Sequence, residues 1–359
     1  MNKGYTLREF RDGDEEGIFE LWQSIHPDDR TGRDEWMKYW TWLYRENPAV
    51  EAIIQVAEDN GKIITHHAIV PVWLNIGTEQ AMGSWGVDAM THPQYRRQGI
   101  WEKVIKEIWV RAADNGIDIT PGFPNRYSLP GLTEKLQWFK ITSMTLAFKP
   151  VDWEKTLAVK VGNRFLLKAG SLVAAVASGV QNINNRRLSG TEDISVHTIT
   201  SFDDRFAALW DNVSRQYLIM TARTPAYLNW RFSRPDAEYT MMAAEKSDEL
   251  QGYVVLRDRD VNGAPVSYIV DMVAESPETM RYLISESVKT CKRNGSAALL
   301  FSYIGDNRYR LPLKREGFLS FPFMKGGLFC ARLNTDRFSQ SMLQETGNWM
   351  VQPSDADTI

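Results

Sequence analysis

An apolar strand that runs through a short basic turn straight into a helix is the feature that most constrains this chain. The strand ends near Thr91, and the turn carries Arg96 and Arg97. A helix is predicted from about Gly99 to Asn115. The first turn of a helix presents backbone N–H groups without intrahelical partners, and the helix dipole adds partial positive charge there. Gly99 has no Cβ to hold a ligand away from these donors, so the segment predicts a pyrophosphate site.

Two common nucleotide-binding loops do not fit this segment. The sequence lacks Gly-x-x-x-x-Gly-Lys-Ser/Thr, and no Gly-x-Gly-x-x-Gly follows a strand here, so ATP and NAD are not favoured ligands. The spacing Arg96-x-x-Gly99-x-Trp101 instead resembles the Gln/Arg-x-x-Gly-x-Gly/Ala loop of the GNAT acyltransferase superfamily. In that family the loop binds the pyrophosphate of acetyl-CoA. The resemblance therefore implies acetyl-CoA as the co-substrate.

The resemblance also implies which residues contact acyl-CoA. One position departs from the family pattern, because Trp101 replaces a small residue, and its indole either narrows the loop or packs beneath it. The end of the strand would contact the pantetheine and the thioester carbonyl, largely through its main chain. A later asparagine resembles the family residue whose amide can bond the pantetheine. The residues assigned to acyl-CoA are Ala89, Met90, Thr91, Arg96, Arg97, Gln98, Gly99, Ile100, Trp101 and Asn125.

The chemistry implied by the resemblance is direct attack of a primary amine on the thioester. The protonated amine must first lose a proton, and Asp88 is the nearest acidic candidate, although a purely structural hydrogen bond is an equally open role for it. Many GNAT proteins protonate the leaving thiolate with a tyrosine that is Thr133 here, so either Tyr127 substitutes for it or the thiolate leaves unassisted. His66 and His67 face opposite sides of one strand, so only one could reach the cleft. No Cys, His or carboxylate cluster has metal-ligand spacing, and no metal is expected.

The fold is predicted to be α/β, with mixed sheets in two tandem GNAT-like domains. The aromatic stretch 39–44 matches 227–232, and Val87-Asp88-Ala89-Met90 matches Val270-Asp271-Met272-Val273. Such internal similarity indicates a repeated unit. After Asp271 the second copy carries acidic residues and no glycine, and carboxylates there would repel phosphate. One CoA site, in the N-terminal half, is therefore expected, and the second copy is degenerate in its CoA loop.

These patterns divide the sequence into four consecutive blocks. An acyl-CoA-binding domain covers residues 1–150, and a strand from Ser143 to Phe148 closes its sheet. A helical linker covers 151–194. The C-terminal GNAT-like domain covers 195–335, and a polar tail over 336–359 is expected to be loosely held.

Composition limits the location and the partners of the chain. Hydrophobic residues make up 43% and charged residues 24%, which is typical of a soluble globular protein. The net charge of −3 gives no overall attraction to nucleic acid. The apolar stretch from Phe165 to Val180 is too short for a membrane span, so no stable membrane insertion is expected. Two cysteines and an N-terminus without a signal-like apolar region favour the cytoplasm.

The sequence thus predicts a cytoplasmic, CoA-dependent N-acetyltransferase that moves an acetyl or another short acyl group from CoA to a small-molecule primary amine. Two alternatives stay open. One is a catalytically inactive acyl-CoA-binding or scaffold module. The other is a protein that resembles the tandem GNAT-like aminoacyl transferases, which use aminoacyl-tRNA. The sequence fixes neither the amine nor the oligomeric state.

Overall fold

The computed structural model describes residues 4–158, 194–304, 307–322 and 327–356. These residues form two compact units, each assembled from segments that alternate along the chain. Unit 1 contains Met1–Ser143, Tyr217–Asp236 and Met324–Trp349, and unit 2 contains Met144–Gln216, Ala237–Phe323 and Met350–Ile359. The consecutive domains 1–150 and 195–335 stay a prediction about sequence repeats, because the compact units divide the chain differently. The apolar stretch from Phe165 to Val180 lies outside the described residues.

Unit 1 is built on a mixed sheet with the strand order β1-β2-β3-β4-β5-β15-β6, and a short strand, β9, also pairs with β3. Only β4 and β5 are parallel among the pairs of this path. The strands are β1 (Thr6–Glu9), β2 (Ile53–Asp59), β3 (Lys62–Ile76), β4 (Glu79–Thr91), β5 (Ile117–Gly122), β6 (Phe139–Ser143), β9 (Ile219–Thr221), β15 (Leu328–Leu333) and β16 (Trp349–Met350).

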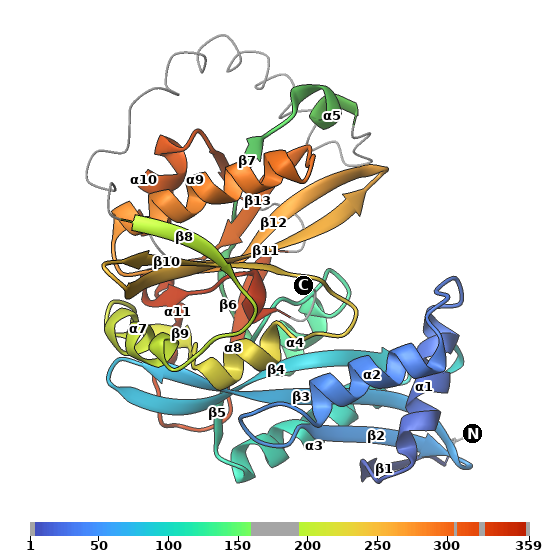
Figure 1. Cartoon of the computed structure of the whole chain (residues 1–359). Coiled ribbons are helices and arrows are strands. Elements are labelled where there is room, and N and C mark those ends of the chain that lie inside the picture. The colour runs from blue at the N-terminus through green and yellow to red at the C-terminus, as the bar shows by residue number, and fades with distance from the viewer. Residues whose placement is uncertain (1–3, 159–193, 305–306, 323–326, 357–359) are drawn as a thin grey trace. The chain divides into compact units, whose positions relative to one another are not determined.

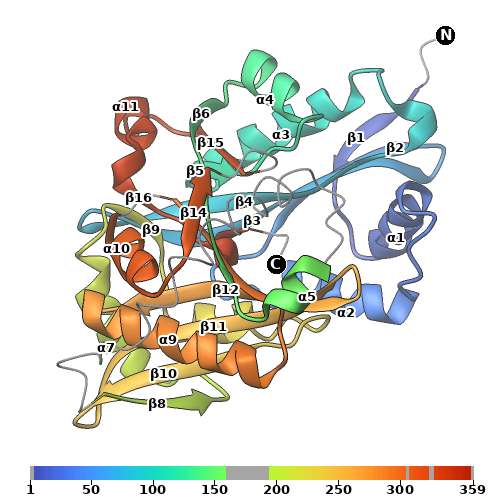
Figure 2. The same ribbon diagram turned by 90° about the horizontal axis from the view of Figure 1, so that it is seen from above.

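Helices cover both faces of the unit 1 sheet. Figures 1 and 2 show α1 and α2 on one face and α3 on the other. The elements are α1 (Asp14–Ile25), α2 (Arg33–Tyr44), η1 (Pro93–Tyr95), α3 (Ile100–Asp114), α4 (Leu129–Lys135), α8 (Pro225–Arg231), α11 (Gln340–Gln344) and η2 (Thr346–Asn348). The amphipathic pattern of α3 explains its place, because Val104, Ile105 and Ile108 recur at helical spacing and are buried against the sheet.

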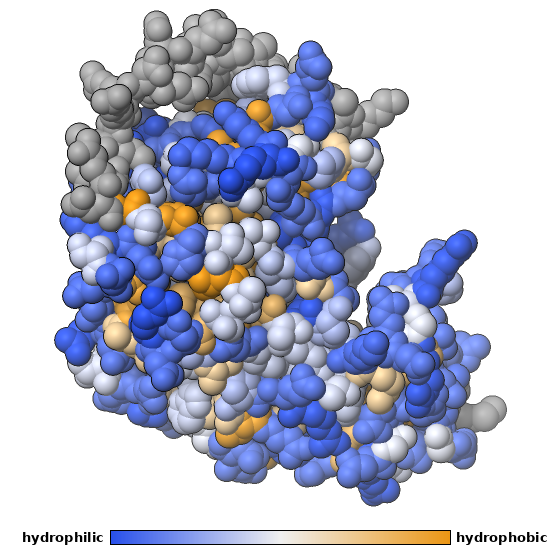
Figure 3. Space-filling view, viewed as in Figure 1, coloured by the Kyte–Doolittle hydropathy of each residue, from blue (hydrophilic) through white to orange (hydrophobic). Residues whose placement is uncertain are grey.

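Unit 2 is built on a second mixed sheet, with the order β14-β7-β13-β12-β11-β10-β8. Its strands are β7 (Thr145–Pro150), β8 (Ile194–Ile199), β10 (Thr240–Lys246), β11 (Glu249–Val261), β12 (Ala264–Ala274), β13 (Ala298–Tyr303) and β14 (Leu319–Pro322). Its helices are α5 (Trp153–Ala158), α7 (Arg205–Ser214), α9 (Pro277–Arg293), α10 (Asn307–Arg315) and η3 (Pro353–Asp355). The predicted α/β class with two mixed sheets is confirmed. The face in Figure 3 is mostly hydrophilic with scattered apolar spots, as expected of a globular surface.

The predicted strand from Ser143 to Phe148 does not close the first sheet, so this prediction is wrong. Strand β7, which covers most of it, pairs with β13 and β14 in unit 2. In unit 1 the late strand β15 lies between β5 and β6 and pairs with both. A periodic apolar pattern reports that one face of a strand is buried, but not against which sheet. The chain therefore exchanges its closing strands between the two units.

Both sheets share one local arrangement, which fits the predicted duplication. A long hairpin, β3–β4 or β11–β12, carries a β-bulge beside the matched Val-Asp motif and is followed by a helix and a parallel strand. The irregularity falls opposite His67 in the first hairpin and between Val255 and Leu256 in the second. A bulge recurring at the same motif is a feature of related sheets rather than a chance defect.

Two tryptophans of the repeated aromatic motif bond to each other within unit 1. Nε1 of Trp42, on α2, donates to the carbonyl of Trp230 at 2.7 Å, and Nε1 of Trp230, on α8, donates to the carbonyl of Trp42 at 2.8 Å. The two rings stack with centroids 5.3 Å apart. Reciprocal contacts of this kind are expected where two related segments meet about a local two-fold axis. They agree with the sequence match of 39–44 to 227–232.

The expectation of a loosely held tail after residue 335 is wrong. Gln352 is fully buried, and its Oε1 accepts from the Met272 N–H at 2.7 Å while its Nε2 donates to the Met272 carbonyl at 2.9 Å. Val351 bridges to Ile304, and the Asp355 carboxylate accepts from the Gln352 N–H at 2.9 Å. The buried amide of Gln352 bonds to the backbone of β12 instead of solvent, which composition does not reveal.

Replacing Gln352 by Leu is expected to lower the free energy of unfolding by roughly 1–3 kcal/mol, because the Met272 N–H would stay buried without its partner. The Met272 carbonyl would keep only the long bond from the Tyr309 hydroxyl, at 3.4 Å. Urea unfolding of the variant measures this loss. Gln80→Leu, at an exposed glutamine on β4, is the matched control and should change little. A Gln352→Leu protein as stable as this control would show that the amide bonds contribute nothing net.

Candidate active site

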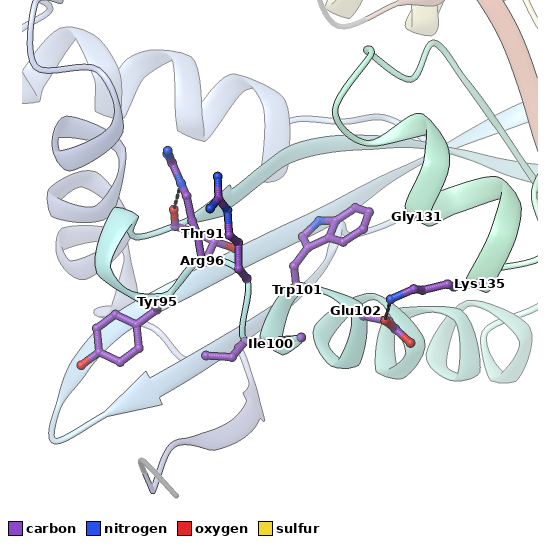
Figure 4. Close-up of a pocket in the computed structure, with 10 residues that line it drawn as sticks. Thr91, Tyr95, Arg96, Ile100, Trp101, Glu102, Gly131 and Lys135 are labelled. Carbon is purple, nitrogen blue, oxygen red and sulfur yellow. Dashed lines mark hydrogen bonds and ion pairs between the residues drawn. The ribbon is translucent and has the colours of Figure 1, made fainter. Parts of the chain in front are cut away.

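The basic turn and the start of α3 enclose a pocket of about 250 Å³ in unit 1 (Figure 4). Arg97 and Gly99 both have left-handed backbone, with φ of 63° and 73°. Gly99 caps α3, and a Cβ at this position would meet nothing within 4 Å, so the space before the helix is open. The pocket is lined by Thr91, Tyr95, Arg96, Arg97, Gly99, Ile100, Trp101, Glu102, Gly131 and Lys135. The predicted turn thus surrounds an accessible helix N-terminus.

Positive charge surrounds the open end of α3. The side chains of Arg96 and Arg97 are exposed, and Arg96 Nε donates to the Thr91 carbonyl at 3.1 Å. The acidic residue of the first helical turn, Glu102, is bonded by two lysines, Lys106 at 2.9 Å and Lys135 at 3.0 Å. Those bonds hold the pKa of Glu102 below its usual value, Lys106 contributing most. The site therefore suits an anion with several oxygens, such as a pyrophosphate.

Trp101 both lines the pocket and packs beneath α4. Its ring lies beside Gly131, where a Cβ would come within 3.0 Å of the indole. The indole also contacts a buried apolar cluster that includes Leu132 and Trp138. Sequence analysis assigned none of Tyr95, Glu102, Gly131 and Lys135 to the site. Gly131 and Lys135 could not be found in this way, because nothing in the sequence places α4 against Trp101.

Strands β4 and β5 separate beside the predicted thioester position. Their parallel pairing in the described residues joins Met82 to Ile117 and Gly83 to Ile119, whereas β4 runs on to Thr91. The hydroxyls of Ser84 and Thr120 lie 2.9 Å apart where the strands part. Beyond this point the main chain of β4 lacks β5 as a partner. Strand edges of this kind offer N–H and carbonyl groups to a ligand.

Asp88 lies in the β-bulge of β4, next to this separation. Its φ of 47° is left-handed, which costs a residue with a side chain about 1–3 kcal/mol and marks a position held by its surroundings. The hydroxyl of Tyr44 donates to Asp88 Oδ2 at 2.6 Å, and His66 Nδ1 donates to the Asp88 carbonyl at 2.9 Å. The matched Asp271 of unit 2 is likewise bonded by a tyrosine, Tyr253, at 2.8 Å. The two tyrosines come from different elements, α2 and β11, but each holds the carboxylate beside the bulge, which gives Asp88 a structural role whatever its chemistry.

His66 and His67 face opposite sides of β3, as predicted, and both are buried. His66 lies against Tyr44 with ring centroids 6.1 Å apart, and His67 against Trp109 on α3 at 6.3 Å. Burial lowers the pKa of both imidazoles, that of His67 to about 3, so both are neutral at pH 7. Neither side chain offers a protonated group to the pocket.

The loop after β5 positions its predicted residues away from the pocket lining. Asn125 Oδ1 accepts from the N–H groups of Tyr127 at 2.8 Å and Ser128 at 3.1 Å, an Asx turn that leads into α4. Tyr127 is 78% exposed and stacks with the Arg126 guanidinium at 4.5 Å. Thr133 donates to the Leu129 carbonyl at 3.0 Å within α4. The pocket lining also omits Asp88, Ala89, Met90 and Gln98, so the roles given to these residues stay predictions.

Residues 6–139 match the family model described as Acetyltransferase (GNAT) domain. This segment, which is less than half of the chain, is therefore similar to GNAT domains. The match includes the bulge at Asp88, the pocket at the start of α3 and all of α4. None of the curated proteins searched matches the sequence significantly. Within the described residues, no helix has the length and apolar character needed to cross a membrane, and no group of three or more His, Cys, Asp or Glu could hold a metal ion.

Solved structures share the fold of residues 6–139 and of the rest of the chain at low sequence identity. A GCN5-related N-acetyltransferase from Anabaena variabilis has a TM-score of 0.64 at 12% identity, over 92% of this chain and 73% of that one. One from Kribbella flavida has a TM-score of 0.62 at 12% identity, over 92% and 71%. Saccharomyces cerevisiae N-myristoyltransferase with bound myristoyl-CoA has a TM-score of 0.58 at 11% identity, over 93% and 79%. At these identities the likeness concerns the fold alone.

Proposed function

We propose that the protein is an N-acyltransferase that moves an acetyl or another short acyl group from CoA to a small-molecule primary amine. The observation that carries the proposal is the open N-terminus of α3 between Arg96 and Arg97, in a domain of the GNAT family. The yeast N-myristoyltransferase of similar fold is described with bound myristoyl-CoA, which supports acyl-CoA as the donor. The acidic segment after Asp271 supports a single CoA site per chain.

In this proposal the pyrophosphate binds the donors of the Arg96–Trp101 turn, and the pantetheine follows the free edge of β4. The main chain of Ala89, Met90 and Thr91 would bond the pantetheine and polarise the thioester carbonyl. The amine nitrogen attacks the carbonyl carbon, the new C–N bond forms, and the C–S bond breaks to release CoA as thiolate. Asp88 accepts the proton that the ammonium loses, while Tyr44 orients its carboxylate through Oδ2.

We further propose a cytoplasmic location, since Cys291 and Cys330 are free and buried, which suits a reducing compartment. A metal ion has no part in the proposed reaction. The leaving thiolate would take its proton from the exposed hydroxyl of Tyr127 or from solvent, because Thr133 is engaged within α4.

The experiment is turnover of acetyl-CoA with a panel of amines, followed by thiol release, in the wild type and Asp88→Asn. The amide keeps an acceptor for the Tyr44 hydroxyl but is a far weaker base, so kcat should fall roughly 10²–10⁴-fold with KM for acetyl-CoA unchanged. Asp211→Asn, at an exposed aspartate of α7, is the control and should keep full activity. Full activity of Asp88→Asn would leave this carboxylate a structural role only.

A second candidate function is a catalytically inactive acyl-CoA-binding module. The observation that favours it is Thr133, which stands where many GNAT proteins carry the tyrosine acid and which bonds within its own helix. Saturable binding of acetyl-CoA without turnover of any amine in the panel would favour this candidate. Binding of aminoacyl-tRNA instead of acetyl-CoA would favour the aminoacyl-transferase alternative.

A further inference from the structure

We propose that the indole of Trp101 is the platform on which the adenine ring of CoA stacks. This inference rests on the proposed function, because it assumes that acyl-CoA enters the pocket at the start of α3. It goes beyond that function by giving a role to the residue that departs from the family loop. Trp101 would then set how tightly the adenosine end of the donor is bound.

The pocket has two chemically different ends. One end carries Arg96, Arg97 and the open N-terminus of α3, which suit phosphate oxygens. The other end is formed by Trp101 together with Gly131 and Lys135 of α4. Figure 4 shows the indole standing between the arginine turn and α4. A ligand bound across this pocket therefore joins a phosphate to a flat apolar group.

The indole is held in place by its neighbours. A Cβ on Gly131 would lie 3.0 Å from the ring atom Cζ3 of Trp101, so the ring fills the space beside this glycine closely. It packs on the buried cluster that contains Leu132, Leu136 and Trp138, and on Leu129 beside it. A ring fixed in this way loses little conformational freedom when a ligand stacks on it.

Adenine is the part of acyl-CoA that matches such a platform. It is the aromatic group of the molecule, and a ribose joins it to the pyrophosphate. Trp101 lies two residues after Gly99, which caps the helix proposed to bind the pyrophosphate. This closeness suits the short distance that the ribose leaves between adenine and the pyrophosphate. Bases stack on aromatic side chains through their π faces, without a need for specific hydrogen bonds. The pantetheine arm has no π system, and its amides match the free edge of β4 instead.

The test is a calorimetric titration of two donors that differ in the adenosine. Acetyl-CoA and acetyl-4′-phosphopantetheine share the pantetheine and one phosphate, but the second lacks adenine, the ribose with its 3′-phosphate, and the other phosphate of the pyrophosphate. Trp101→Leu should weaken acetyl-CoA binding about ten-fold and leave acetyl-4′-phosphopantetheine within about two-fold. Trp101→Phe should recover part of the loss. Trp73→Leu, at a 41% exposed tryptophan of β3, is the control and should bind both donors as the wild type does.

An equal loss of both donors in Trp101→Leu would overturn the inference, because the indole would then support the loop and not the adenine. Unchanged or tighter acetyl-CoA binding would overturn it too, since the indole would then narrow the pocket. If Trp101→Leu does not fold, Trp101→Phe and competition of adenosine 3′,5′-bisphosphate against acetyl-CoA in the wild type take its place; failure of this nucleotide to compete contradicts an adenine site. Binding of neither donor to the wild type would instead contradict the proposed function.

Discussion

Acetyl-CoA binding is expected to weaken on the order of a hundred-fold or more in Gly99→Glu. The substitution puts a carboxylate at the open end of α3, where the pyrophosphate is proposed to bind. The negative charges of the carboxylate and of the pyrophosphate would then lie close together and repel each other strongly. A Cβ at position 99 meets nothing within 4 Å, so the protein should still fold. The left-handed φ of 73° adds a cost of about 1 kcal/mol in stability. Calorimetric titration of acetyl-CoA into both proteins measures the effect.

Two controls separate charge from backbone strain in this experiment. Gly263→Glu makes the same change at a glycine of unit 2 with φ of 86° and no neighbour within 4 Å of a Cβ, so it should bind acetyl-CoA normally. Gly99→Asn keeps a residue that tolerates left-handed backbone and adds no charge, so it should lose less affinity than Gly99→Glu. Undiminished binding by Gly99→Glu would mean that acetyl-CoA does not reach the start of α3.

A chain that ends at residue 150 is expected not to fold, although it holds the whole GNAT family match. It lacks β15, which is the strand partner of β6 and covers the edge of β5. It also lacks Phe329, Cys330 and Ala331, all fully buried in the intact protein. Its own last strand, β7, pairs only with strands of unit 2 in the described structure. The fragment should aggregate or show no cooperative thermal transition by circular dichroism.

Co-expression of residues 1–150 with residues 151–359 is the matched control for this truncation. The second fragment supplies β15, α8 and the partners of β7, so the two should associate and recover one soluble complex. A fragment 1–150 that unfolds cooperatively by itself, within a few degrees of the full chain, would contradict the idea that strand exchange is needed for unit 1.

Local pattern predicted much of the fold and the core of the candidate site. The strand that ends at Thr91, the basic turn and the helix that becomes α3 all follow from local residue patterns. The Trp42 to Trp230 match rests on repeated residues that the structure joins by reciprocal hydrogen bonds. These features depend on residues close together in sequence or on direct similarity between segments.

Features that depend on contacts between distant segments of the chain were not predicted from the sequence. Nothing in Thr145–Pro150 indicates that it pairs with β13, since any neighbouring sheet could bury its apolar face. The polar Gln352 reads as a surface residue until Met272 is found beside it. The part of Trp101 in the pocket depends on Gly131, whose lack of a side chain matters only because α4 lies against the indole. In each case the sequence lacks the identity of the segment that packs against the residue, whereas its own tendency to form a helix or strand is not in question.

Strand exchange also sets an order of events during synthesis. Strands β1 to β6 leave the ribosome long before β15, which begins at Leu328. Domains usually fold as they emerge, at about 5–20 residues per second, so the first sheet waits on the order of ten seconds or more for its missing strand. During that time β5 carries an unpaired edge, which is a template for pairing with other nascent chains. Production of this protein therefore depends on what protects that edge until translation is nearly complete.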